Sequence, residues 1–200
     1  MNNKSIIMTI PIRDIYNNFA IVSKNGRALE FIPEEEKDYK ICLAAVKQTG
    51  YALKFVPKEL QSEELCLAAI KETGYALQYV LKKFQTAKLC AIACKKSKYS
   101  NSFQYIKREL LNSEDFCIDL INEYPEIFKF FYKKIKTPKV SLIAVKKNFL
   151  NFLSIKQSKQ TLEMIEYVFD NSRDKILMKH INKDIASDHI KYYLEINNIK

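Results

Sequence analysis

The sequence predicts an all-α protein, a right-handed helical-repeat solenoid, from two regularities. Helix-capping residues recur with steps of 24, 24, 24, 27, 24 and 24 residues at seven positions, which are Asp14, Asp38, Ser62, Thr86, Ser113, Thr137 and Thr161. The three glycines, Gly26, Gly50 and Gly74, each lie twelve residues after a cap. Self-similarity with a period of about 20 to 50 residues is typical of stacked repeats. We therefore expect about seven 24-residue units in one continuous array.

The array is expected to form a single domain over residues 1–200, with different structures at its two ends. Residues 1–13 resemble the second half of a unit, and residues 14–171 carry the repeats. Residues 172–200 leave the period and are expected to form two closing helices, Arg173–His180 and Asp188–Ile196. Terminal repeats of solenoids commonly differ in this way, because they must cover the exposed end of the core.

Each repeat should contain one longer and one shorter helix. The clearest repeats read DYKICLAAVKQTGYALKFVPKELQ from Asp38 and SEELCLAAIKETGYALQYVLKKFQ from Ser62. The capping residue opens a helix of about ten residues, and the glycine is expected to end it in the left-handed conformation. Apolar residues wrap nearly all around this helix, so we expect neighbouring repeats to cover it on both sides.

The shorter helix follows the glycine, and Pro57 breaks it or opens the next turn in the second of these repeats. An aromatic position recurs in this segment, and we interpret it as core between repeats: Phe31, Phe55, Tyr79, Tyr105, Phe130 and Phe152. The residues between this segment and the next cap are expected to form a turn or a single helical turn.

Cysteine also occupies a repeat position, four residues after a cap, at Cys42, Cys66, Cys90 and Cys117, and Ser141 stands at the same place. A small side chain buried where helices approach closely explains this series. Neither a CxxC pair nor a Cys/His cluster with zinc-like spacing occurs, although Cys90 and Cys94 share a helical face. We expect reduced thiols, no metal and no cofactor.

The best-preserved motifs resemble a known family. They are CLAAVKQTGYALKFV at Cys42–Val56, CLAAIKETGYALQYV at Cys66–Val80 and NGRALEFI at Asn25–Ile32. Together they resemble a bacterial repeat family, domain of unknown function 4116, over roughly residues 20–82. The resemblance implies helical repeats and carries no catalytic or binding residues with it. Beyond Cys90 only the spacing persists.

Positive charge is concentrated in parts of the chain. The net charge is +10, and residues 73–108 and 127–162 contain no Asp or Glu while carrying +8 and +9. A solenoid aligns equivalent positions, so we expect a basic stripe of Lys47, Lys71, Lys95, Lys96, Lys98, Lys134, Lys146 and Lys147. Such a stripe would attract a phosphate backbone or an acidic protein surface. The alternative is that these lysines only complement the helix dipole and keep the surface hydrated.

The sequence disfavours an enzyme. It contains no Gly-rich phosphate loop, HExxH motif or nucleophile elbow, and its two histidines, His180 and His189, lie near the C-terminal end. No apolar run approaches the roughly 18 residues needed to span a membrane. Met1–Pro11 lacks the features of a signal peptide. We therefore expect a cytoplasmic protein with no membrane partner.

Two functional hypotheses remain. The first is a non-enzymatic interaction scaffold whose basic stripe binds an acidic surface of a protein partner. The second is binding to RNA or a ribonucleoprotein, with Tyr51, Tyr75 and Tyr99 as stacking residues; one concrete form is an inhibitor of a host nucleic-acid-guided nuclease encoded by a mobile element. Lysine outnumbers arginine 29 to 4, which suggests an AT-rich coding genome and favours point-charge attraction over bidentate base reading.

Overall fold

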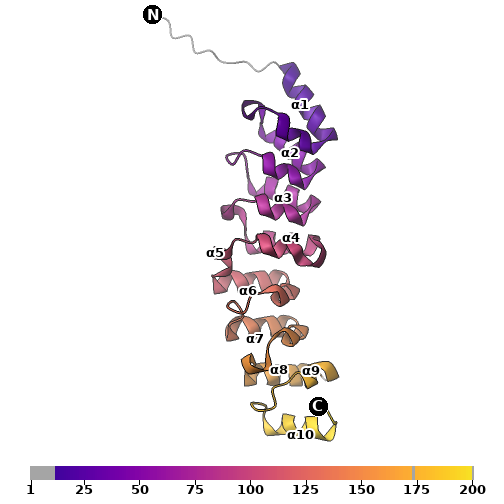
Figure 1. Cartoon of the computed structure of the whole chain (residues 1–200), viewed down its shortest axis with the longest axis vertical. Helices are drawn as coiled ribbons and strands as arrows, with labels where there is room; N and C mark the ends of the chain where they lie inside the picture. The colour runs from indigo at the N-terminus through magenta and orange to yellow at the C-terminus, as the bar shows by residue number, and fades with distance from the viewer. Residues whose placement is uncertain (1–11, 173, 200) are drawn as a thin grey trace, which may run out of the picture. The chain divides into compact units, whose positions relative to one another are not determined.

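The computed structural model describes residues 12–172 and 174–199, with side chains except at 12–16 and 98–101. All regular elements in these ranges are helical, which confirms the predicted all-α class (Figure 1). The chain divides into an N-terminal unit, Met1–Tyr105, and a C-terminal unit, Ile106–Lys200. Within each unit the helices pack in chain order, as in a helical-repeat solenoid. The predicted half-unit at residues 1–13 lies almost wholly outside the described residues.

The longer helix of each repeat begins at the predicted cap in six cases. These helices are α2 (Tyr39–Gln48), α3 (Glu63–Glu72), α4 (Ala87–Lys96), α6 (Glu114–Glu123), α7 (Pro138–Lys147) and α8 (Leu162–Asn171). In each, the side-chain oxygen of the cap accepts a hydrogen bond from the N–H three residues later, at 2.7 Å in Asp38. The prediction was wrong for Asp14, because α1 (Ile12–Lys24) already includes it.

The shorter helix is a 3₁₀-helix. Six such elements follow the longer helices: η1 (Gly26–Phe31), η3 (Gly50–Phe55), η4 (Gly74–Tyr79), η6 (Lys98–Tyr105), η7 (Pro125–Phe130) and η8 (Phe149–Ser154). A 3₁₀-helix has three residues per turn, so residues three apart share a face. The apolar pair Leu53 and Val56 has this spacing, and both side chains are buried. The equivalent pairs in the other five repeats are buried as well.

The aromatic position that was interpreted as core is not core throughout. Phe31 is 83% exposed, and Phe55, Tyr79, Tyr105 and Phe130 are only partly buried. Phe152 is fully buried because it occupies the position of Leu29, Leu53 and Leu77. The core lies two residues earlier along the 3₁₀-helix, since the face that turns inward is set by the three-residue period.

Glycine has a different role from the one predicted. None of the three glycines has a positive φ, so they do not supply a left-handed helix end. Each instead begins a 3₁₀-helix against the longer helix of the next repeat. A Cβ at Gly50 would lie 2.2 Å from the backbone oxygen of Ala69, and Gly26 and Gly74 have the same relation to Ala45 and Ala93. Only glycine allows this close approach.

The two rows of helices persist through each unit. In the N-terminal unit α1, α2, α3 and α4 pack successively, as do η1, η3, η4 and η6. In the C-terminal unit α6, α7 and α8 form one row, and η7 and η8 the other. The closing helices are confirmed as α9 (Lys175–Lys179), which packs on η8, and α10 (Asp188–Ile196). The ring of Phe169 in α8 lies 5.1 Å from that of Tyr193 in α10.

Short third elements connect the 3₁₀-helix to the next cap in several repeats, as the predicted single turn allowed. They are η2 (Glu34–Glu36), η5 (Lys82–Phe84), α5 (Arg108–Leu111) and η9 (Gln157–Lys159). The residue directly before the cap then turns inward in most repeats. Gln61 donates to the backbone oxygen of Tyr79 at 3.2 Å, and Gln85 donates to that of Tyr105 at 3.3 Å. A buried polar side chain therefore links each of these repeats to the next.

We predict that Gly50→Ala lowers the free energy of unfolding by about 2 to 3 kcal/mol, because the new methyl group overlaps a backbone carbonyl that cannot move independently of its helix. Urea denaturation followed by circular dichroism measures the change. Lys58→Ala, at an exposed position of the same repeat, should stay within about 0.5 kcal/mol of the wild type. An equally small effect of Gly50→Ala would contradict the proposed role of glycine.

The five cysteines are free and buried, as predicted for the repeat-position thiols Cys42, Cys66, Cys90 and Cys117. Burial raises the pKa of the Cys42, Cys66 and Cys117 thiols from 9.0 to about 11 and that of Cys94 to about 12. Burial also raises the pKa of Cys90, with a smaller contribution from Cys94. The thiol form is therefore favoured well above neutral pH.

We predict that these thiols react slowly with a disulfide reagent at about pH 8 in the folded protein. They should react rapidly in about 6 M guanidinium chloride, which unfolds the protein. The thiolate is the reactive form, so labelling should accelerate only as the pH approaches the raised pKa values. Absorbance of the released thiolate gives the rate. Immediate labelling of Cys42 and Cys66 in the folded state would show that the helices are not packed as described.

Candidate basic binding site

A concave pocket of about 560 Å³ lies in the C-terminal unit, between two successive connections. The first connection follows η7 and the second follows η8. The pocket is lined by five lysines and three serines, together with Phe131 and Ile155: Lys133, Lys134, Lys136, Lys156, Lys159, Ser141, Ser154 and Ser158. No Asp or Glu is among these residues. We call this feature the basic pocket.

The 3₁₀-helices position the two connections. Phe131 and Ile155 directly follow η7 and η8, and both side chains are buried, so each connection is anchored in the core at its first residue. The residues that follow are exposed at Lys133, Lys134 and Lys156. Because the same anchor recurs in adjacent repeats, lysines from both connections reach the same concavity.

Of the five lysines in the basic pocket, Lys136 is partly buried and the other four are exposed. Its Nζ donates to the backbone oxygen of Ser154 at 3.3 Å and lies 4.5 Å from the centre of the Phe128 ring. Desolvation lowers the pKa of this ammonium. Gln61 and Gln85 make the corresponding bonds in the N-terminal unit, so Lys136 adds a positive charge where those repeats have a neutral amide.

Lys37 occupies the same place before an earlier cap, and the comparison is informative. Its Nζ donates to the backbone oxygen of Phe55 at 3.1 Å, as expected for this position. It also forms an ion pair with Glu34 at 2.5 Å. The charge of Lys37 is thereby compensated within its own connection, whereas the lining of the basic pocket supplies no carboxylate to Lys136.

Ser141 adds a polar group where other repeats have cysteine. It stands four residues after its cap, its side chain is 2% exposed, and it lines the basic pocket. The other members of this series are buried thiols with raised pKa values. The substitution therefore exchanges a soft apolar group for a hydroxyl that can donate a hydrogen bond into the pocket.

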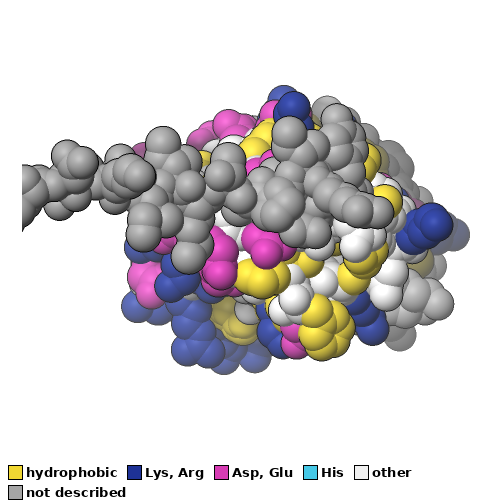
Figure 2. Space-filling view, turned by 90° about the horizontal axis from the view of Figure 1, so that it is seen from above, with side chains coloured by type: hydrophobic (Ala, Val, Ile, Leu, Met, Phe, Trp, Pro, Cys, Tyr) yellow, Lys and Arg dark blue, Asp and Glu magenta, His cyan; other side chains and the backbone are white. Residues whose placement is uncertain are grey.

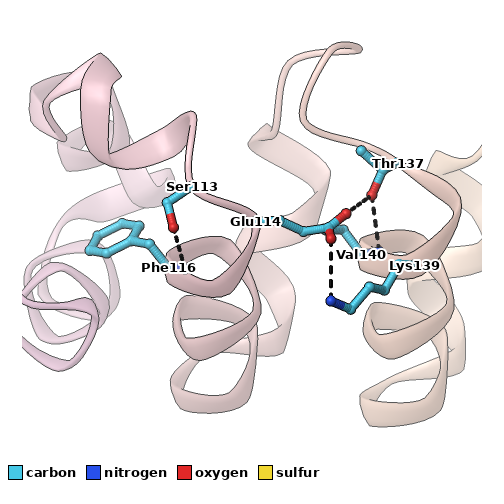
Figure 3. Close-up of polar contacts among 6 residues, drawn as sticks. All are labelled: Ser113, Glu114, Phe116, Thr137, Lys139 and Val140. Carbon is cyan, nitrogen blue, oxygen red and sulfur yellow. Dashed lines mark hydrogen bonds and ion pairs between the residues drawn. The ribbon is translucent and has the colours of Figure 1, made fainter.

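An acidic side chain of the same unit, Glu114, is held by the next helix start (Figure 3). The Thr137 hydroxyl donates to its carboxylate at 2.5 Å, and the Lys139 ammonium lies 3.3 Å away. These hydrogen bonds lower the pKa of Glu114, with that of Thr137 contributing most. Thr137 at the same time accepts from the N–H of Val140 as the cap of α7. Glu114 thus links α6 to α7 and balances Lys139.

The predicted stripe is only partly assembled in the N-terminal unit. Lys47, Lys71, Lys95 and Lys96 all lie exposed in the last turn of a longer helix. Lys47 and Lys71 line one groove between α2 and α3, but Glu64 and Glu72 line it too. Figure 2 likewise shows basic and acidic side chains interspersed on the face in view. The structure thus places the first two lysines together on a surface of mixed sign.

The stripe lysines of the C-terminal unit have different surroundings. Lys146 forms an ion pair with Glu163 at 2.9 Å, and its Nζ lies 6.0 Å from the centre of the Tyr167 ring. Lys147 is exposed. Lys134 alone among the predicted lysines lines the basic pocket. The side chain of Lys98 lies outside the described residues.

Two of the tyrosines expected to stack on bases, Tyr51 and Tyr75, belong to the N-terminal unit and do not line the basic pocket. Tyr51 lies in η3, and the guanidinium carbon of Arg27 is 5.9 Å from its ring centre. Tyr75 is partly buried in η4, and its backbone oxygen accepts from Gln78. The side chain of Tyr99 lies outside the described residues. A contact with RNA at these positions remains a hypothesis.

Sequence reasoning missed four lysines of the basic pocket, namely Lys133, Lys136, Lys156 and Lys159. The signal was present, since all four belong to the acid-free segment 127–162. The predicted stripe follows the ends of the longer helices, so it includes Lys146 and Lys147 of that segment instead. The pocket is built from connections, whose alignment across repeats depends on the buried anchors Phe131 and Ile155.

The fold and the caps define a helical-repeat protein. The family described as Domain of unknown function (DUF4116) matches residues 19–61 and, overlapping them, residues 38–85. This confirms the resemblance indicated by the motifs over residues 20–82. No curated protein and no solved structure matches the chain.

The described part of the chain contains no group of three or more His, Cys, Asp or Glu side chains that could hold a metal ion. Within the same residues, every helix is too short or too polar to cross a membrane.

Proposed function

We propose that the protein is a non-enzymatic binding scaffold of the cytoplasm, and that its C-terminal unit holds an acidic segment of a partner protein in the basic pocket. The observation that carries this proposal is the meeting of five lysines in a concavity of about 560 Å³ whose lining has no acidic residue. The N-terminal unit, with its regular repeats, supplies a rigid scaffold.

The electrostatics support an anionic ligand. Like charges within a few ångströms repel one another, and a concave surface focuses their field more strongly than a flat one. A carboxylate in the basic pocket relieves this repulsion and gains hydrogen bonds from the ammonium groups and from the serine hydroxyls. The ammonium of Lys136 should attract a carboxylate more strongly than the exposed ammonium groups do, because its partial burial reduces screening by water.

The shape of the charged surface favours a protein segment over RNA. A nucleic acid backbone is followed by cations along an extended groove, together with exposed aromatic rings for stacking. The groove of Lys47 and Lys71 in the N-terminal unit contains two glutamates, which oppose a phosphate backbone. The basic pocket is local and compact, as suits one or two acidic side chains of a peptide.

We predict that the triple variant Lys133→Glu, Lys156→Glu, Lys159→Glu binds a fluorescein-labelled peptide rich in Glu and Asp at least about tenfold more weakly than the wild type, a change of about 1.4 kcal/mol. Fluorescence anisotropy measures the affinity at about 50 mM and about 150 mM salt, where the Debye length is on the order of 14 Å and 8 Å. The melting temperature should hardly change, because exposed charges contribute little to stability.

The matched control makes the same change of charge in the N-terminal unit, as Lys47→Glu, Lys71→Glu, Lys88→Glu. All three positions are exposed, and this variant should retain the affinity of the wild type within about twofold. Equal losses in both variants would indicate attraction by net charge alone. Tighter binding of a single-stranded RNA than of the peptide, with a steep dependence on salt, would favour the RNA hypothesis instead.

A further inference from the structure

A second concavity adjoins the basic pocket and is mainly apolar. It encloses about 280 Å³ and is lined by Leu111, Tyr132 and Ile135, with Arg108, Asn112 and Lys134 at polar positions. Tyr132 is 53% exposed, although it is a large aromatic side chain. We call this feature the apolar hollow. None of these six residues is acidic, and Glu114 lines a smaller adjoining hollow with Leu111, Lys134 and Ile135.

The apolar hollow arises where the repeat is irregular. The step between caps is 27 residues rather than 24 at Thr86 to Ser113, and the extra residues lengthen η6 and the connection that follows it. That connection forms α5, a single α-helical turn packed on α6. Other repeats have 3₁₀-helix or turn at this point.

The irregularity changes the residue before the cap. Asn112 stands before Ser113 and is exposed, whereas Gln61 and Gln85 stand before the preceding caps and are buried. The buried place is taken by Leu111, an apolar residue that accepts from Cys117 Sγ through its backbone oxygen at 3.4 Å. A polar link between repeats is thereby replaced by an apolar surface that is open to solvent on one side.

Lys134 joins the two features, because it lines both the basic pocket and the apolar hollow. Tyr132 and Ile135 belong to the same connection as Lys133 and Lys136. One short stretch of chain thus presents apolar side chains to one concavity and ammonium groups to the other. A peptide that binds here contacts ammonium groups and apolar side chains at positions only a few of its own residues apart.

Building on the proposed function, we infer that the partner segment is an extended peptide in which an acidic cluster is followed closely by one large apolar side chain, with the cluster in the basic pocket and the apolar side chain in the apolar hollow. The cationic rim of Arg108 and Lys134 selects against a basic partner. A second copy of this chain, with a net charge of +10, would bring like charges together.

The inference is tested with two fluorescein-labelled peptides that share an acidic cluster and differ only in a Leu or a Ser placed two residues after it. Wild-type protein should bind the Leu peptide about tenfold more tightly than the Ser peptide, since the leucine side chain leaves water. The variant Tyr132→Ala should remove most of this preference while leaving the affinity for the Ser peptide unchanged. Tyr192→Ala, 66% exposed on α10, is the control and should keep the preference.

Each outcome bears on one proposal. Equal affinity of the wild type for the two peptides overturns the inference and leaves the proposed function standing, whereas no binding of either peptide overturns both. A Tyr132→Ala variant that keeps the full preference for leucine also overturns the inference. If Tyr132→Ala instead weakens the binding of a single-stranded RNA probe and leaves the binding of both peptides unchanged, the ring stacks on bases and the inference is wrong. Circular dichroism and thermal melting confirm that each variant is folded.

Discussion

The repeat distance in the N-terminal unit depends on the approach of a glycine to a backbone carbonyl of the next repeat. A Cβ at Gly26, Gly50 or Gly74 would lie 2.1 to 2.3 Å from that oxygen, which is closer than any side chain permits. The carbonyl already accepts from the end of its own helix, as Ala45 does from Thr49 at 2.9 Å. Its position is therefore fixed by the helix, and the spacing of 24 residues follows wherever glycine is kept.

The C-terminal unit meets the same requirement by other means. Pro125 and Phe149 stand where glycine would be, and Asn151 bridges two repeats by donating to the backbone oxygens of Pro125 and Ala144, each at 3.0 Å. The side chain of Asn151 is itself buried, so this polar bridge lies within the core. The basic pocket and the apolar hollow both lie in this unit.

Regular features of the sequence predicted the fold well, because caps, apolar blocks and cysteines act locally. The caps of α2, α3, α4, α6, α7 and α8 and the buried thiols followed from residue type and spacing alone. The 3₁₀ geometry was missed, although the spacing of Leu53 and Val56 carries it. The glycine role could not be found from the sequence, because the clash depends on a residue of the next repeat. The same holds for the site. Lys71 faces a groove that contains glutamates, and Lys134 faces a pocket without them. Packing between repeats decides which of these surroundings a lysine has.

The proposed site coincides with the departures from the repeat. Residues 19–85, which match the family of unknown function, form regular repeats with glycine contacts and buried glutamines. The basic pocket and the apolar hollow use Lys136 in place of glutamine, Ser141 in place of cysteine and Leu111 in place of a polar link. Lys136 keeps the link to the next repeat that Gln61, Gln85 and Lys37 make in the N-terminal unit. A structural position can acquire a binding role when the rest of the repeat still supplies the anchor, as Phe131 and Ile155 do here.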